Sequence, residues 1–103
     1  MNERIIPPAA LRDPEALEVV RVWIAERGLH VSLWIGAYKD TDIPEEAAWG
    51  IILADIARHV SRGLSEEVDF PPARILERIV DSFRDEIEAP TSKVTGELIK
   101  GHD

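Results

Sequence analysis

The residue pair with the clearest chemical potential is Asp55 and His59, which lie four positions apart in a predicted helix. That spacing brings a carboxylate beside an imidazole, an arrangement that can orient a histidine as a general base. No convincing nucleophile completes the set, because Ser61 and Ser65 lie on or near the end of the same helix. An exposed helix pair is the simpler interpretation, since the helix dipole favours a cation in the last turn.

Metal and phosphate sites are not indicated by the spacing of the polar residues. His30 and Glu26, near a predicted hairpin turn, and His102 in the tail show no recognised zinc pattern. The acids of residues 39–46 lack the glycine and the final glutamate of an EF-hand, and helix capping explains them. The glycines form neither GxGxxG nor GxxxxGK[ST]. We therefore predict no cofactor, no metal and a non-enzymatic role, although the sequence leaves enzymatic activity open.

Composition and charge set the class of protein. The chain has 103 residues, 45% of them hydrophobic and 31% charged, which is typical of one folded domain. Its formal net charge of −8 disfavours nucleic acid and anionic membranes, because both bind clustered Lys and Arg. The chain contains no cysteine, no apolar run of about 20 residues and no signal-peptide pattern. We expect a soluble cytoplasmic protein that binds neither nucleic acid nor membrane.

Two runs of β-branched and aromatic residues predict an antiparallel hairpin over about residues 18–26 and 29–38. Pairing Glu26 with Leu29 places the aliphatic row of each strand on the same face. A shift of the register by an even number of residues would preserve this alignment, whereas a shift of one would turn one row outward. Gly28 is expected to supply the positive φ of the turn.

The opposite face of this hairpin carries a second set of large side chains, namely Arg21, Trp23, His30, Trp34 and Tyr38. In the predicted register Arg21 lies opposite Trp34, where its guanidinium could stack on the indole. Patches rich in aromatic residues and Arg are typical of interface cores, so we predict a protein-interaction face. The alternatives are a terminal segment that covers the rings, cross-strand pairs that only stabilise the hairpin, or a small-molecule or enzyme site at this face or in a dimer cleft.

Apolar residues at helical spacing predict two α-helices, over about residues 43–62 and 71–88, which cover the aliphatic face of the hairpin. Gly50 lies inside the first helix, where glycine costs about 1 kcal/mol relative to alanine. Close approach of the helix backbone to the sheet would compensate for that cost. Gly63 is expected to end the helix in the left-handed conformation.

The dimensions of these elements predict that something must widen the sheet. Two helices side by side are about 20 Å wide, whereas two strands at about 4.8 Å spacing provide roughly half that width. Residues 4–6, residues 93–99 or a second copy of the chain could add strands, and we favour the second copy, alone or with a terminal segment. The sequence thus predicts a homodimer of a single α+β domain, residues 1–103, with an extended lead-in over 1–17 and an unassigned tail over 90–103.

The segments LEVVRVWIAERGLHVSLWIGAY and AAWGIILADIARHVSRGL, together with the IPPAAL entry, resemble a family of short bacterial proteins, the domain-of-unknown-function family numbered 5076. The resemblance covers about residues 5–64. It implies a compact α+β domain in a bacterial protein. It brings no activity, cofactor or catalytic residue that could be assigned to positions of this chain.

Overall fold

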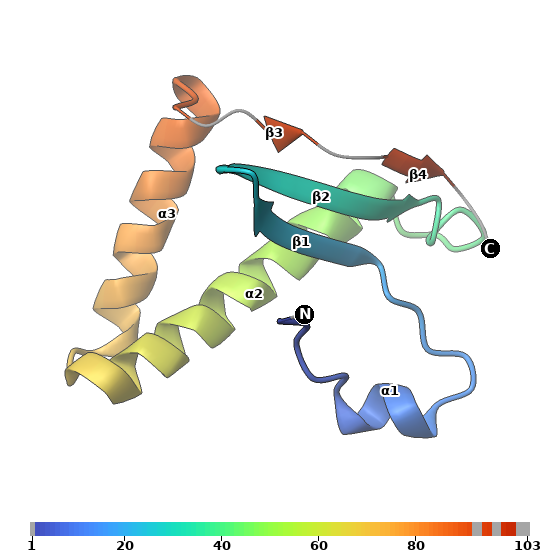
Figure 1. Ribbon diagram of the computed structural model, residues 1–103, viewed down its shortest axis with the longest axis horizontal. Helices are drawn as coiled ribbons and strands as arrows, with labels where there is room; N and C mark the ends of the chain where they lie inside the picture. The colour runs from blue at the N-terminus through green and yellow to red at the C-terminus, as the bar shows by residue number, and fades with distance from the viewer. Residues whose placement is uncertain (1, 92–93, 96–97, 101–103) are drawn as a thin grey trace.

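A computed structural model describes residues 2–91 in full and the backbone of residues 94–95 and 98–100. The elements in chain order are α1 (Pro8–Arg12), β1 (Val20–Ala25), β2 (Gly28–Ile35), α2 (Glu45–Val68), α3 (Pro72–Glu88), β3 (Val94–Thr95) and β4 (Leu98–Lys100) (Figure 1). The predicted α+β class, with an antiparallel hairpin followed by two long helices, is confirmed.

The hairpin turn has the predicted length of two residues but lies one residue earlier in the chain. Trp23 lies opposite His30, which shifts the register by two residues from the predicted one. The loop consists of Glu26 and Arg27, whose φ angles of 51° and 63° are both positive, as a type I′ turn requires. The predicted role of Gly28 is therefore wrong, because this residue is the first of β2. The even shift keeps the aliphatic and aromatic rows on separate faces.

The C-terminal tail widens the sheet. Both β3 and β4 pair in parallel with β2, so the strand order is β1, β2 and then the tail. Of the two terminal segments considered for this role, the tail supplies the strands, and residues 4–6 lie in no strand. Within the described chain β1 is consequently an edge strand.

The helix α2 is six residues longer at its C-terminal end than the sequence predicted. Gly63 does not end it, and the chain leaves the helix only at Asp69, which has a left-handed φ of 52°. The Asp69 amide donates to the Ser65 carbonyl at 3.1 Å. A left-handed residue after the last turn is a common helix ending, and aspartate tolerates this conformation better than most residues.

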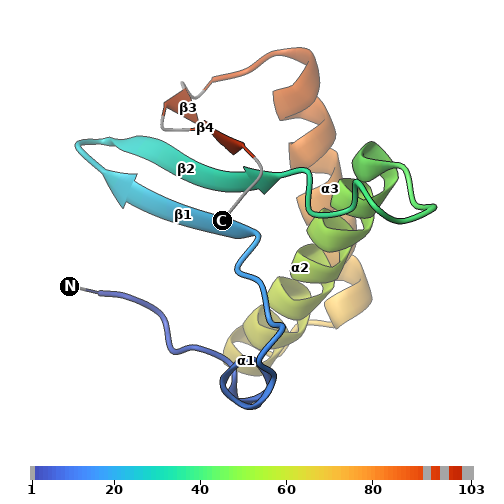
Figure 2. The ribbon, with the colours of Figure 1, turned by 90° about the vertical axis from the view of Figure 1, so that its right-hand side faces the viewer.

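The two long helices pack against each other and diverge from the joint at residues 69–71 (Figure 1). The most buried described side chains are Ser61, Ala48 and Ile75, which are 2%, 4% and 8% exposed. The aliphatic face of β1 is largely uncovered, because Val22 and Ile24 remain 54% and 83% exposed. The N-terminal segment and α1 lie below β1 in Figure 2, and Figure 1 shows α1 on the other side of the molecule from α3. The fold is therefore open, with little core of its own.

Candidate interaction site

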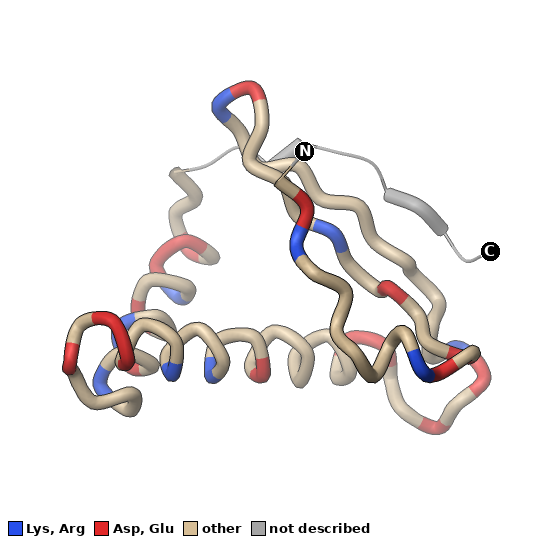
Figure 3. The backbone as a smooth tube through the Cα atoms, turned by 60° about the horizontal axis from the view of Figure 1, so that its bottom comes forward, with Lys and Arg blue, Asp and Glu red and all other residues tan. Residues whose placement is uncertain are grey.

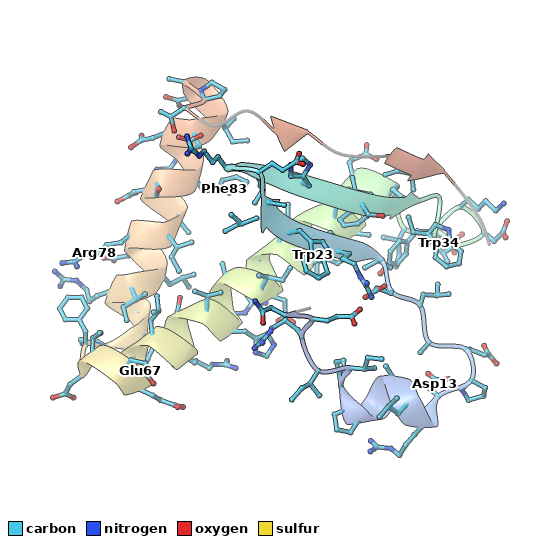
Figure 4. The ribbon with its side chains drawn as sticks, in the orientation of Figure 1. Asp13, Trp23, Trp34, Glu67, Arg78 and Phe83 are labelled. Atoms are coloured by element: carbon cyan, nitrogen blue, oxygen red, sulfur yellow. The ribbon has the colours of Figure 1, made fainter. Side chains whose placement is uncertain are left out.

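Four of the predicted site residues share one face of the hairpin. Arg21 and Trp23 alternate on β1, and His30 and Trp34 alternate on β2, so their side chains lie on the same side of the sheet. All four side chains are half-buried, and Figure 4 shows the two indoles along the hairpin. We call this set the aromatic face. Tyr38 lies three residues beyond the end of β2, in the loop that leads to α2.

The guanidinium of Arg21 is held by carboxylates. Its Nε and Nη2 atoms donate to Glu18 at 3.3 and 3.0 Å, and its Nη1 lies 2.8 Å from a carboxylate oxygen of Glu3. These carboxylates, Glu18 above all, raise the pKa of Arg21. The predicted position of Trp34 directly opposite Arg21 is wrong, because the residue opposite Arg21 is Ser32. The ion pair to Glu3 instead ties the N-terminal segment to the aromatic face.

A recess of about 580 Å³ lies between this N-terminal segment and β1. Its walls include Ile5 and Ile6 on one side and Leu17 and Trp23 on the other. Ile5 is 88% exposed, so the segment faces the recess without filling it. A terminal segment thus borders the aromatic face, as one of the sequence-based alternatives anticipated, but leaves an apolar space beside it.

The recess adjoins backbone groups that point away from the sheet. The amide of Trp34 donates to the Val19 carbonyl at 3.0 Å, which makes these residues a hydrogen-bonded pair of the antiparallel ladder. Because such pairs alternate, Val20, Val22 and Ile24 direct their amides and carbonyls away from β2. Among the described residues, no strand pairs with this edge. Such an edge is a template for an added strand.

Glu45 is a structural anchor that the sequence analysis missed. Its carboxylate accepts hydrogen bonds from the Gly36 amide at 2.9 Å, the Tyr38 amide at 3.2 Å and the Trp49 indole at 3.1 Å. These donors, the Gly36 amide most strongly, lower the pKa of Glu45. The anchor fastens the loop after β2 to the first turn of α2. Tyr38 takes part through its backbone, and only the four-residue spacing of Glu45 and Trp49 was visible in the sequence.

The remaining predicted residues are His30 at the hairpin turn and the Asp55–His59 pair on α2. The Nε2 of His30 lies 3.1 Å from the Ala25 carbonyl, across the hairpin turn. His59 and Asp55 are 3.5 Å apart on the surface of α2, and the same carboxylate is 3.3 Å from Arg58. Within the described ranges, no group of three or more His, Cys, Asp or Glu residues is placed to hold a metal ion. No helix among them combines the length and apolarity needed to cross a bilayer.

These features define a small α+β domain with an open sheet edge beside an aromatic face. The chain belongs to the family described as domain of unknown function DUF5076, which matches residues 3–91. The match confirms the resemblance seen in the sequence and extends it through α3. A solved structure from the photosynthetic bacterium Rhodopseudomonas palustrus, provisionally described as a pyruvate dehydrogenase, is 31% identical, with a TM-score of 0.69 over 94% of each chain. No curated protein matches this chain.

Proposed function

We propose that this protein is a non-enzymatic interaction module of the bacterial cytoplasm, which binds an extended segment of a partner protein along β1. The observation that carries this proposal is the outward-pointing backbone of Val20, Val22 and Ile24 beside the aromatic face. An added strand would form main-chain hydrogen bonds to these groups. Its alternate side chains would enter the recess, next to Trp23.

The aromatic face gives such an edge its selectivity. Main-chain pairing is common to all extended segments, whereas pockets for alternate side chains distinguish one segment from another. Trp23 and the isoleucines across the recess favour an apolar or aromatic side chain at the central position of the partner. The exposed Arg21–Glu3 pair can exchange, so an acidic residue of the partner can replace Glu3.

A small carboxylate in the recess is the alternative function. The recess volume of about 580 Å³ is within the usual range for ligand pockets, roughly 300–1,000 Å³. Pyruvate, the substrate implied by the description of the similar structure, would bind through its carboxylate, and both Arg4 and Arg21 line the recess. At Arg21 it would have to displace Glu3 or Glu18, which already neutralise this guanidinium. The open edge therefore favours a protein segment over a metabolite.

The substitution Val22→Pro tests the proposal, because the Val22 amide points outward and is not part of the β1–β2 ladder. Proline removes one edge donor and blocks strand addition, while Val22→Thr keeps the donor as a matched control. Peptides selected from a random library on the native protein should bind the proline variant at least tenfold more weakly and the threonine variant almost unchanged. Fluorescence polarisation measures the affinities, and circular dichroism verifies the fold.

Two results would contradict this interpretation. Equal peptide affinity for the native protein and the proline variant would show that the edge of β1 is not used. Calorimetric binding of pyruvate that is lost in Arg21→Gln but kept in Val22→Pro would establish the small-molecule alternative instead.

A further inference from the structure

The helix α2 carries a row of aliphatic side chains that the rest of the described chain leaves exposed. Leu53, Ile56, Val60 and Leu64 follow each other at intervals of three or four residues, so they lie on one face of the helix. Each is between 44% and 47% exposed. We call them the α2 stripe. A helix normally turns such a stripe toward a core.

The stripe continues into an apolar groove between α2 and α3. The groove has a volume of about 780 Å³, and its walls include Leu64 and Val68 from α2 and Ile79 and Phe83 from α3. Because Leu64 belongs to both surfaces, they form one continuous apolar area. Phe83 is 52% exposed and Val68 is 60% exposed in this area.

The total surface shows that this exposure is far beyond that of an ordinary monomer. A folded monomer of 11.6 kDa exposes about 5,800 Å², whereas this chain exposes 8810 Å². Its radius of gyration is 15.5 Å, compared with about 13 Å for a compact domain of this length. The excess of about 3,000 Å² exceeds the roughly 800 Å² that each partner buries in a standard interface. For two copies the excess is about 6,000 Å² in total, which is large enough for an obligate homodimer, whose interfaces bury from about 2,000 to more than 5,000 Å² in total.

Two glycines beside the stripe indicate what kind of element covers it. Gly50 and Gly63 lie within α2, where each costs about 1 kcal/mol relative to alanine. A Cβ atom built on either residue meets no atom within 4 Å. The predicted close approach of Gly50 to the sheet of its own chain is therefore wrong. On a helical projection at 100° per residue both glycines flank the α2 stripe, where another backbone can come close.

We propose that a second copy of this chain covers the α2 stripe and the adjoining groove. The inference is independent of strand addition at β1, because it concerns another surface. Each copy carries a net charge of −8, so two copies repel each other at long range and their attraction must come from apolar surface. The stripe contains no charged residue, the lining of the groove contains one acid and one base, Glu86 and Arg78, and Figure 3 shows acidic residues gathered near both ends of α2. A two-fold contact brings the same patch from each copy together, and an uncharged apolar stripe is complementary to itself.

Sedimentation equilibrium over a wide concentration range tests the proposal on the full chain. The native protein should have twice the 11.6 kDa mass of one chain. Val60→Glu should raise the dissociation constant at least about 100-fold, because it buries an unpaired charge in the contact. Ile51→Glu is the matched control, since Ile51 is 64% exposed and projects from the opposite side of α2. It should leave the dimer intact.

A second measurement keeps the test decisive if Val60→Glu does not fold. The chain contains no cysteine, so Val60→Cys and Ile51→Cys each introduce a single thiol. Reaction of the thiol at position 60 with a soluble reagent should slow at least tenfold as concentration rises through the dimer range, while position 51 reacts at a constant rate. A native mass of one chain at every concentration would overturn the proposal. So would a dimer in which the thiol at position 60 stays as reactive as that at position 51.

Discussion

Replacement of Ile75 by alanine tests whether the contact between α2 and α3 supplies most of the core of this domain. Ile75 is 8% exposed, so Ile75→Ala loses nearly the full transfer free energy of the removed carbons and leaves a cavity. Such substitutions cost about 2–5 kcal/mol, and the open groove beside Ile75 places the expected loss in the lower half of that range. We expect the free energy of unfolding to fall by about 2–3 kcal/mol and Tm by roughly 8–20 °C.

The matched control is the same substitution at Ile51, which is also inside a long helix but 64% exposed. Because Ile51 is only about one third buried, Ile51→Ala should lose roughly 0.5–1 kcal/mol of the free energy of burial. The better helix propensity of alanine should offset about half of that loss. Urea unfolding followed by circular dichroism, at one fixed protein concentration, gives both values. Equal losses at the two positions would refute the reasoning, because the same atoms are removed and only the burial differs.

Two further substitutions test the helix ends. Glu45→Gln should loosen the loop after β2, because a neutral amide is a weaker acceptor for the Gly36, Tyr38 and Trp49 donors. Since these donors lower the pKa of Glu45, their contribution to stability is complete above the usual carboxyl pKa and is lost as the pH falls through the lowered one. Acid titration of the unfolding midpoint should therefore be shallower in the variant, and identical titrations would exclude the anchor. Asp69→Gly should stabilise the protein by about 0.5–1 kcal/mol, because glycine adopts the φ of 52° without strain. Thermal unfolding measures this gain, and a loss of stability would show that the Asp69 side chain has another role.

Periodicity predicted most of the fold because it reports which faces are buried. The alternation of Leu29, Val31 and Leu33 placed two rows on opposite faces of β2, and the structure retains that division. The turn was less predictable, because Glu26 and Arg27 carry positive φ angles while the nearby glycine does not. Sequence rules assign positive φ angles to glycine first, because any other side chain costs about 1–2 kcal/mol in that conformation. This cost is small enough for tertiary structure to override the preference.

The candidate site was predictable in part, for a similar reason. Alternation was enough to bring Arg21, Trp23, His30 and Trp34 to one face, because it depends only on the strand geometry. One partner of Arg21, Glu3, lies 18 residues earlier in the chain, and the partners of Glu45 include two backbone amides. Backbone donors leave no trace in the residue types. The openness of the fold was also hidden, because an apolar stripe looks the same whether its own chain or another covers it.

The parallel pairing of the tail with β2 sets an order of events during folding. Leu29 and Val94 are partners in this ladder, so its closure joins residues on either side of both long helices. Loop-closure entropy for such a separation is about 3–4 kcal/mol, whereas the hairpin closes over two residues. The hairpin and the helix pair can form during synthesis, but β2 keeps an open edge until residues 94–100 have been made. Newly made chains are therefore most vulnerable to misassociation before that segment pairs, when two sheet edges and the α2 stripe are exposed together.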